Sequence, residues 1–439
     1  MNSSPANIMS AYASPPAALR ELLSGRREFF SLPQPFYTDA EVFNLDLEAI
    51  FYKRWIFAGA ECEIASPGDY LTLSIGPTPI VVLRDQSRAV RAFFNTCRHR
   101  GSKICLADKG AVRRLVCPYH QWTYDLTGRL VSTGKMGDGF DREQYPLRAV
   151  NVRTAGGTIY ICLSDAPPDF DSYASSIAPY LAPHGLRDAK LAHESHVVVK
   201  GNWKLVMENS RECFHCPARH HELMQTFLHD YNFEEPANDD VVTAFWEKCS
   251  SFGLVSENRE GQDFRTIRLP LRKGALSSTM DGAPAVNRVL GTMPTNDAGS
   301  VRWVHFPSTF NHAFADYAIL VRMLPLAPQL TLFTTKWLVH RDAEAGRDYD
   351  LERLVQVWST TNDQDKALVE RNQEGVNSAG YAPGPYSQHA EQGVIRFVEW
   401  YCARLEEHLD ESVASANVAP RWTGPAVRSV AEVATPRQP

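Results

Sequence analysis

The fold of this chain is decided by two short stretches, Cys97-Arg98-His99-Arg100-Gly101 and Cys117-Pro118-Tyr119-His120. Each stretch offers one thiolate and one imidazole from a tight turn. Two cysteines and two histidines suit either a structural zinc ion or a [2Fe–2S] cluster in which two histidines bind one iron. Zinc fingers usually pair cysteine with cysteine and histidine with histidine along the chain. The mixed pairs therefore favour the iron–sulfur cluster, with Cys97, His99, Cys117 and His120 as ligands.

The residues after the second turn set aside the alternative that these are four unrelated polar loop residues. The turn continues as Gln121-Trp122-Thr123-Tyr124, with Gly128 beyond. The combined pattern C-x-H-R-G and C-P-Y-H-x-W-x-Y resembles the signature of Rieske oxygenases. This resemblance implies a Rieske [2Fe–2S] domain and a second domain that holds a mononuclear non-haem Fe(II).

Length and composition limit the class of protein. A chain of 439 residues with 44% hydrophobic and 22% charged residues predicts a soluble globular protein of two domains. A net charge of −6 argues against a nucleic-acid partner. Nine cysteines without regular spacing indicate reduced thiols and a cytoplasmic location. We expect no signal peptide and no membrane span, because the first thirty residues lack an apolar core and no run of eighteen apolar residues exists.

The pattern along the chain predicts an α+β fold. We expect an N-terminal segment over residues 1–44 that packs on the catalytic domain, an all-β Rieske domain over 45–165, a catalytic domain over 166–412 and a flexible tail over 413–439. Short strands split by Gly and Pro predict a small β-sandwich in the second segment. The catalytic domain is expected to contain an antiparallel sheet flanked by helices, with helices near residues 203–214, 350–373 and 390–409.

A second candidate metal site lies in the stretch Glu212-x-x-His215-x4-His220. We expect Glu212 and His215 to share a helix face, and Pro217 to end that helix before His220. Two imidazoles and a distant carboxylate make the facial triad of non-haem Fe(II) oxygenases. Asp365 falls in the middle of the apolar face of the helix predicted over Asp350 to Glu374, whereas Asp363 lies opposite that face.

The resemblance supports the same choices, because the family's ligand aspartate precedes a segment similar to Lys366-Ala367-Leu368-Val369-Glu370. Three alternatives stay open near the triad. His221 could replace His220, Asn209 could approach the iron, and Cys213-x-x-Cys216 could form a redox pair.

The resemblance also implies how the two centres cooperate. In the family, subunits pack head to tail, usually as a trimer, and the cluster of one subunit serves the iron of the next. Carried over to this chain, Glu212 links His120 of one subunit to His215 of its neighbour. No flavin- or nicotinamide-binding Gly motif is visible, so a separate NAD(P)H-dependent reductase of the ferredoxin or flavin type is expected to supply electrons.

Beyond the metal motifs, the resemblance is to the branch that oxidises quaternary ammonium compounds, the glycine betaine monooxygenases and stachydrine demethylases. It rests on pieces such as Leu32-Pro33-Gln34-Pro35-Phe36-Tyr37 and Lys336-Trp337-Leu338-Val339-His340. It implies O2-dependent N-demethylation of glycine betaine or a related betaine, with release of formaldehyde. Because a quaternary ammonium has no N–H, aromatic faces and carboxylates must recognise it. The candidates are Trp303, Phe310 and Tyr317.

Three other functions remain as alternatives. One is hydroxylation of carnitine or choline, a second is oxygenation of an aromatic ring, and a third is electron transfer without oxygenase chemistry. Relatives tend towards Asn-His-Phe-Leu-Pro-Asp-His where this chain has Asn311-His312-Ala313-Phe314-Ala315-Asp316-Tyr317. That departure leaves the particular betaine open.

Overall fold

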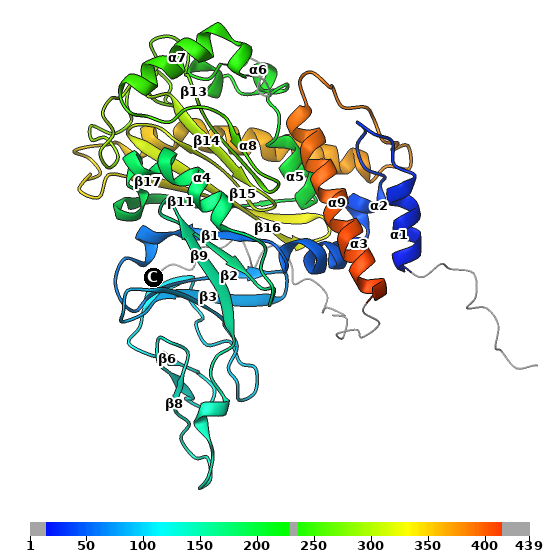
Figure 1. Ribbon diagram of the computed structural model, residues 1–439, viewed down its shortest axis with the longest axis vertical. Helices are drawn as coiled ribbons and strands as arrows, with labels where there is room; N and C mark the ends of the chain where they lie inside the picture. The colour runs from blue at the N-terminus through cyan, green and yellow to red at the C-terminus, as the bar shows by residue number, and fades with distance from the viewer. Residues whose placement is uncertain (1–14, 229–235, 415–439) are drawn as a thin grey trace, which may run out of the picture.

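The structure of the chain is a computed structural model that describes residues 15–228 and 236–414 (Figure 1). Residues 1–14 of the expected N-terminal segment and all but the start of the expected C-terminal tail lie outside the described residues. Within the described residues, no helix combines the length and apolar character that a bilayer span requires.

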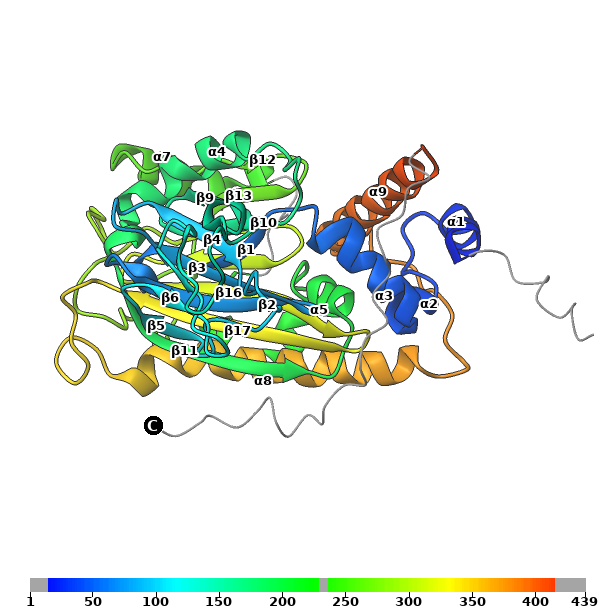
Figure 2. The ribbon, with the colours of Figure 1, turned by 90° about the horizontal axis from the view of Figure 1, so that it is seen from below.

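The described chain begins with a helical segment that packs beside the last helix (Figures 1 and 2). Its elements are α1 (Pro15–Ser24), α2 (Pro35–Thr38), α3 (Ala40–Asp46) and a π-helical turn (Leu47–Phe51). Asp39 caps α3 by accepting the N–H groups of Glu41 and Val42. The fully buried Asp46 carboxylate accepts hydrogen bonds from Trp203 (2.9 Å) and Tyr401 (2.6 Å) and also contacts Lys204. This network ties the N-terminal segment to the catalytic helices.

The expected Rieske domain is built from two antiparallel sheets. The larger sheet has the order β1-β10-β9-β4-β3-β2-β5 and the smaller one the order β6-β7-β8. Alternating and continuous apolar runs form these strands. A two-residue loop with Gly76 at φ +53° joins β2 (Asp69–Ile75) to β3 (Thr78–Arg84). The strands are β1 (Ile56–Ala60), β2 (Asp69–Ile75), β3 (Thr78–Arg84), β4 (Val90–Phe94), β5 (Lys109–Ala111), β6 (Leu115–Val116), β7 (Thr123–Tyr124), β8 (Leu130–Ser132), β9 (Ala149–Ala155) and β10 (Thr158–Cys162).

The catalytic domain is a seven-stranded antiparallel sheet with the order β11-β17-β16-β15-β14-β13-β12. Its strands are β11 (Lys190–Val199), β12 (Arg259–Glu260), β13 (Phe264–Leu269), β14 (Ser300–His305), β15 (Thr309–Ala313), β16 (Tyr317–Ala327) and β17 (Leu330–Val339). The α+β fold with an antiparallel catalytic sheet is therefore confirmed.

Helices cover this sheet, and the long helix α8 runs along it (Figure 2). The helices are α4 (Asp171–Leu181), α5 (Trp203–Asn209), α6 (Cys216–Arg219), α7 (Asp240–Ser251), α8 (Leu351–Val376) and α9 (Gln392–Ala414). Short 3-10 turns complete the structure at Glu61–Ile64, Arg142–Gln144, Ala182–His184, Leu186–Asp188, Leu223–Gln225 and Pro236–Asn238.

A buried charge network joins the two domains. Glu63 of the Rieske domain lies 2.8 Å from the Lys336 ammonium on β17 and 2.6 Å from that of Lys109. Glu194 on β11 contacts both lysines from the other side. Burial opposes ionisation of Glu194, but the two ammonium groups outweigh it and lower its pKa to about 2. The network holds the larger Rieske sheet against the catalytic sheet.

Candidate metal centres and the adjoining cavity

Two similar turns carry the candidate cluster ligands. In the first, Gly101 N–H donates to the Cys97 carbonyl (2.9 Å), and in the second, Gln121 N–H donates to the Cys117 carbonyl (3.0 Å). The closing residue of each turn has positive φ, +78° at Gly101 and +57° at Gln121. The local sequence therefore presents one cysteine and one histidine from each turn.

The side chains of these turns converge and fit a [2Fe–2S] cluster. Cys97 and Cys117 are buried, and the His99 and His120 rings lie 4.6 Å apart. His99 also stacks on Trp122 at 4.9 Å, which orients its ring. Its Nδ1 atom is buried and has no hydrogen-bond partner among the described residues, as expected of a nitrogen that binds iron.

The cluster turns lie far from the second metal site of the same chain. Strands β6 and β8, which adjoin the turns, project from one end of the molecule, whereas α6 and α8 lie at the other end (Figure 1). His120 and Tyr119 are exposed on this projection. One chain therefore presents its candidate cluster ligands to the surface and not to its own candidate iron ligands.

The segment that carries Glu212 and His215 is not the single helix predicted over residues 203–214. Helix α5 ends at Asn209, and His215 precedes the short helix α6. The Glu212 carboxylate accepts the N–H groups of Phe214 and His215, so it satisfies backbone donors that a continuous helix would have paired. Pro217 lies in the first turn of α6 and starts a helix, contrary to the expectation that it ends one, because proline is well tolerated there.

Three ligand atoms from distant segments meet beside α6. His215 Nε2 and His220 Nε2 lie 3.0 Å apart, and Asp365 Oδ1 lies 3.3 Å and 3.1 Å from them. The Asp365 Oδ1 atom is buried and makes no hydrogen bond among the described residues. Two imidazole nitrogens and one carboxylate oxygen in this arrangement fit a mononuclear Fe(II).

Each imidazole is oriented through its other nitrogen. Glu212 Oε1 lies 2.5 Å from His215 Nδ1, and Gln364 Oε1 lies 2.7 Å from His220 Nδ1. Gln364 in turn donates to Glu222 at 2.9 Å. Such partners point Nε2 at the shared centre. Sequence reasoning missed Gln364, and only its position next to Asp365 could have suggested it.

The electrostatics of this group follow from its geometry. Burial alone would lower the pKa of His215, but the neighbouring Asp365 and Glu212 carboxylates raise it to about 9. The pKa of His220 is also raised against the effect of burial, mainly by Asp365. The two imidazoles in turn keep the pKa of the Asp365 carboxyl below its usual range, although burial opposes this.

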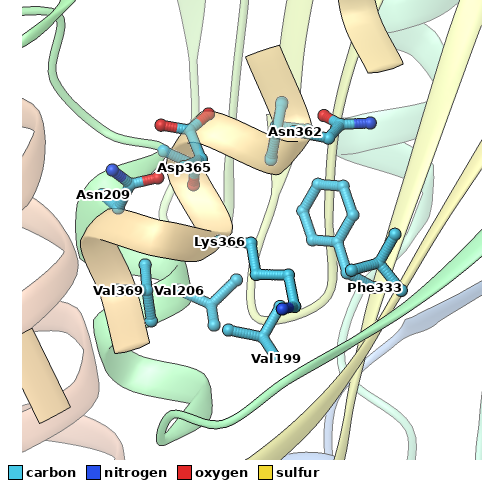
Figure 3. A pocket seen from close by; sticks show the side chains of 11 residues that line it. Val199, Val206, Asn209, Phe333, Asn362, Asp365, Lys366 and Val369 are labelled. Carbon is cyan, nitrogen blue, oxygen red and sulfur yellow. The ribbon is translucent and has the colours of Figure 1, made fainter. Parts of the chain in front are cut away.

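The structure bears on two of the alternatives left open by the sequence. The His221 side chain is exposed, so His220 and not His221 faces the other two ligand atoms. Asn209 and Asp365 line a small cavity of about 20 Å³ between α5 and α8 (Figure 3). Asn209 therefore lies beside the candidate iron site.

Cys213 and Cys216 form a disulfide, with their Cα atoms 4.9 Å apart. The expectation that all cysteines are reduced thiols is therefore wrong for this pair, because the turn into α6 brings the two residues within bonding range. Cys216 Sγ also lies near the two imidazoles. The disulfide occupies this sulfur, which leaves the Asp365 carboxylate to complete the ligand set.

A larger cavity of about 600 Å³ opens from the ligand atoms towards the sheet. His215, His220 and Asp365 all line it, and its volume suits a small organic ligand. Phe310 lines both this cavity and the smaller one. A small molecule held in the larger cavity would lie next to the candidate iron ligands.

Of the three predicted aromatic contacts, Phe310 and Trp303 line the cavity and Tyr317 does not. Trp303 also packs in the core with Tyr160 and Phe170. Tyr317 is fully buried outside the cavity lining, where it donates to the Ser278 carbonyl at 2.7 Å. Side-chain alternation along the strands sends these rings into the core.

The cavity is also lined by an aromatic wall of three rings that the sequence did not predict. The rings of Phe227, His312 and Trp358 lie 4.7 to 5.7 Å from one another. Burial, reinforced by Arg302 and Arg211, holds the pKa of His312 well below its usual range, so its ring is neutral. Trp358 lies on the same apolar face of α8 that led to the prediction of Asp365. This shared face could have identified Trp358 as a residue of the site.

Comparison with known families agrees with this geometry. Residues 54–146 match the family model of the Rieske [2Fe-2S] domain, and residues 186–407 match that of the ring hydroxylating alpha subunit (catalytic domain). The chain therefore belongs to the Rieske non-haem iron oxygenases, as the resemblance of its motifs implied. It is an oxidoreductase with a Rieske [2Fe–2S] cluster and a mononuclear non-haem iron.

Individual proteins of known name are similar to this chain over nearly its whole length. The chain is 45% identical over 421 residues to the glycine betaine monooxygenase oxygenase subunit of Chromohalobacter salexigens, which covers 93% of this chain and 94% of the relative. It is 44% identical over 411 residues to that of Pseudomonas aeruginosa, which covers 90% and 94%. The fold also matches the apo structure of a quaternary ammonium Rieske monooxygenase, with a TM-score of 0.65 at 22% identity over 88% of this chain and 98% of that one.

Proposed function

We propose that this protein is the oxygenase component of a monooxygenase that removes an N-methyl group from glycine betaine or a related betaine. The observation that carries the proposal is the 45% identity to a glycine betaine monooxygenase oxygenase subunit over nearly the whole chain. The aromatic wall beside the candidate iron ligands supports it independently, because aromatic faces attract a quaternary ammonium.

We assign the metal ligands from the geometry. Cys97, His99, Cys117 and His120 hold the [2Fe–2S] cluster, and His215, His220 and Asp365 hold the mononuclear iron. When bound, the cluster supplies single electrons and the mononuclear iron activates O2. His215, His220 and Asp365 line the cavity, so they place the iron next to a substrate that the aromatic rings hold.

The reaction balances as an oxygenation followed by loss of formaldehyde. One oxygen atom of O2 enters a C–H bond of an N-methyl group, and the other leaves as water after uptake of two electrons and two protons. The resulting carbinolamine breaks its N–CH2OH bond and releases formaldehyde, a proton and a tertiary amine. A separate reductase, driven by NAD(P)H, supplies the electrons.

We propose that the subunits assemble as a homotrimer. In this assembly electrons pass from the cluster of one subunit to the iron of the next. The exposed His120 and Tyr119 of one subunit dock near Glu212 and Phe214 of the next, where the Phe214 side chain is 68% exposed. Glu212 already contacts His215 through one oxygen. As a positioning residue, it links the two centres across the interface.

The function is tested by turnover with a reductase under O2. Glycine betaine, stachydrine, carnitine and choline are supplied in turn, and oxygen uptake, formaldehyde and the amine product are measured. Formaldehyde in equal amount to one demethylated betaine is the expected result. Oxygen uptake without any organic product, or no turnover from protein that holds all its iron, would overturn the proposal.

The path between subunits has its own test. A cluster-deficient variant, Cys97→Ser, and an iron-deficient variant, Asp365→Ala, are each expected to be inactive alone. Mixed oligomers obtained by co-expression should recover part of the activity, because some interfaces then pair an intact cluster with an intact iron site. Absence of recovery in mixed oligomers of verified composition would contradict transfer between subunits.

A further inference from the structure

The cavity next to the iron ligands carries an excess of positive charge. Among its described lining residues are four arginines, Arg211, Arg265, Arg302 and Arg396, against two carboxylates, Glu212 and Asp365. Both carboxylates face imidazoles of the iron site. A cavity that only had to hold a cation would not be expected to gather arginines, because like charges repel more strongly away from bulk water.

Two of these arginines, Arg265 and Arg396, contact Glu260 at the edge of the cavity. Glu260 on β12 lies 3.1 Å from the Arg396 guanidinium and 3.9 Å from that of Arg265. Arg265 also donates to the Asn258 side chain at 2.8 Å. These contacts form a rim network between β12, β13 and α9.

Arg302 occupies a different position, against the aromatic wall. On β14 it pairs in register with His312 of β15, so both side chains lie on the same face of the sheet. Its guanidinium lies 4.5 Å from the centre of the Phe227 ring. Phe227 and His312 are two of the three rings of the wall, so the cation lies directly beside the place where a quaternary ammonium would bind.

Helix α8 connects this place to the iron site. Trp358, Thr361 and Asp365 all line the cavity and lie on one side of the helix. Trp358 and Asp365 lie seven positions apart on the helix, a rise of about 10 Å between their backbones. The cavity therefore extends from the candidate iron ligand Asp365 to the aromatic wall beside Arg302.

We propose that Arg302 binds the carboxylate of the substrate, and that the site therefore selects a zwitterionic betaine over a quaternary ammonium with an uncharged end. The inference rests on the proposed function and names the residue that sets its substrate class. The ring faces of Phe227, His312 and Trp358 receive the trimethylammonium group. The guanidinium receives the two carboxylate oxygens.

The selection follows from charge. A betaine has no net charge and brings a carboxylate to the arginine-rich wall, whereas choline brings a net positive charge and a hydroxyl. The guanidinium can form two parallel hydrogen bonds with the oppositely charged carboxylate, whereas the choline hydroxyl offers one oxygen without a charge. The same arginine therefore attracts one compound and repels the other.

The test compares binding and turnover of glycine betaine and choline in wild type, Arg302→Gln and Arg302→Lys. Calorimetric titration of the iron-loaded protein without O2 gives Kd, and reductase-coupled assays give kcat/KM. We expect Arg302→Gln to raise the Kd of glycine betaine about 10- to 100-fold and to change that of choline much less. Arg302→Lys should lie between wild type and Arg302→Gln, because it keeps the charge and loses the two-pronged contact.

Arg259→Gln serves as the matched control, since Arg259 is an exposed arginine on β12 of the same sheet, outside the cavity lining. Iron content and the cluster absorption spectrum check that each variant folds. If wild type demethylates glycine betaine and Arg302→Gln keeps both its Kd and its preference over choline, the assignment of Arg302 is overturned and the proposed function stands. If wild type demethylates no betaine, the proposed function itself fails.

Discussion

Asp365 Oδ1 lies 3.1 Å from Nε2 of His220, although the two residues belong to α8 and to the loop after α6. The Asp365 side chain is half-buried, and its buried Oδ1 atom makes no hydrogen bond among the described residues. A buried carboxylate oxygen in such surroundings is costly unless a cation compensates it. This contact links the long helix of the catalytic domain to the loop that carries the two candidate iron-binding histidines.

Replacing Asp365 should remove the mononuclear iron and leave the cluster. For Asp365→Ala we expect iron to fall from three to two atoms per chain, with the cluster spectrum unchanged and turnover lost. Iron analysis with visible spectroscopy measures this. Asp363→Ala is the matched control because Asp363 is exposed on the same helix. Three irons per chain in Asp365→Ala would refute the assignment.

Replacing Glu212 should greatly reduce turnover while both metals stay bound. Glu212→Ala removes the carboxylate that lies 2.5 Å from His215 Nδ1 and that we propose reaches His120 of the neighbouring subunit. We expect both metals to remain and turnover to fall by at least about 100-fold, since the change disrupts orientation of the imidazole and coupling of the centres. Iron content and single-turnover rates distinguish the two effects. Turnover like that of wild type would exclude this role for Glu212.

Gln364 should tune iron affinity through His220. Gln364→Leu removes the acceptor 2.7 Å from His220 Nδ1, so the ring loses its fixed orientation. We expect iron affinity to fall about 10- to 100-fold, with the cluster unaffected. Competition with a chelator measures the affinity. Gln356→Leu, eight residues earlier on α8, is a suitable control, and equal iron affinity in the two variants would contradict the prediction.

The charge network between the domains should make stability depend on pH. The pKa of Glu194 is lowered to about 2 from an ordinary value near 4.5, so its contribution to stability is present above pH 4.5 and is lost as the pH falls towards 2. Glu194→Gln should therefore cost about 2 to 3 kcal/mol of unfolding free energy at pH 7 and progressively less below pH 4.5. Denaturant unfolding between pH 7 and pH 3 measures the difference. A difference that stays constant with pH would show that ionisation of Glu194 is not its source.

The sequence by itself determined the cluster turns and the class of fold. Cys97, His99, Cys117 and His120 lie within two short turns, whose geometry depends on neighbouring residues such as Gly101. Periodicity also predicted α8 and placed Asp365 on its apolar face, because helical repeat is a local property. Local pattern was misleading between Asn209 and Cys216, where side-chain capping by Glu212 competes with a continuous helix.

Only the tertiary structure decided what surrounds the substrate cavity. Packing of α8 beside the α6 loop brings Asp365 and Gln364 to the two histidines, and the register of β14 with β15 puts Arg302 beside His312. The same alternation sends Trp303 into the core. These contacts join segments far apart in the chain, so no local pattern specifies them, and the cavity exists only once the sheet and helices have packed.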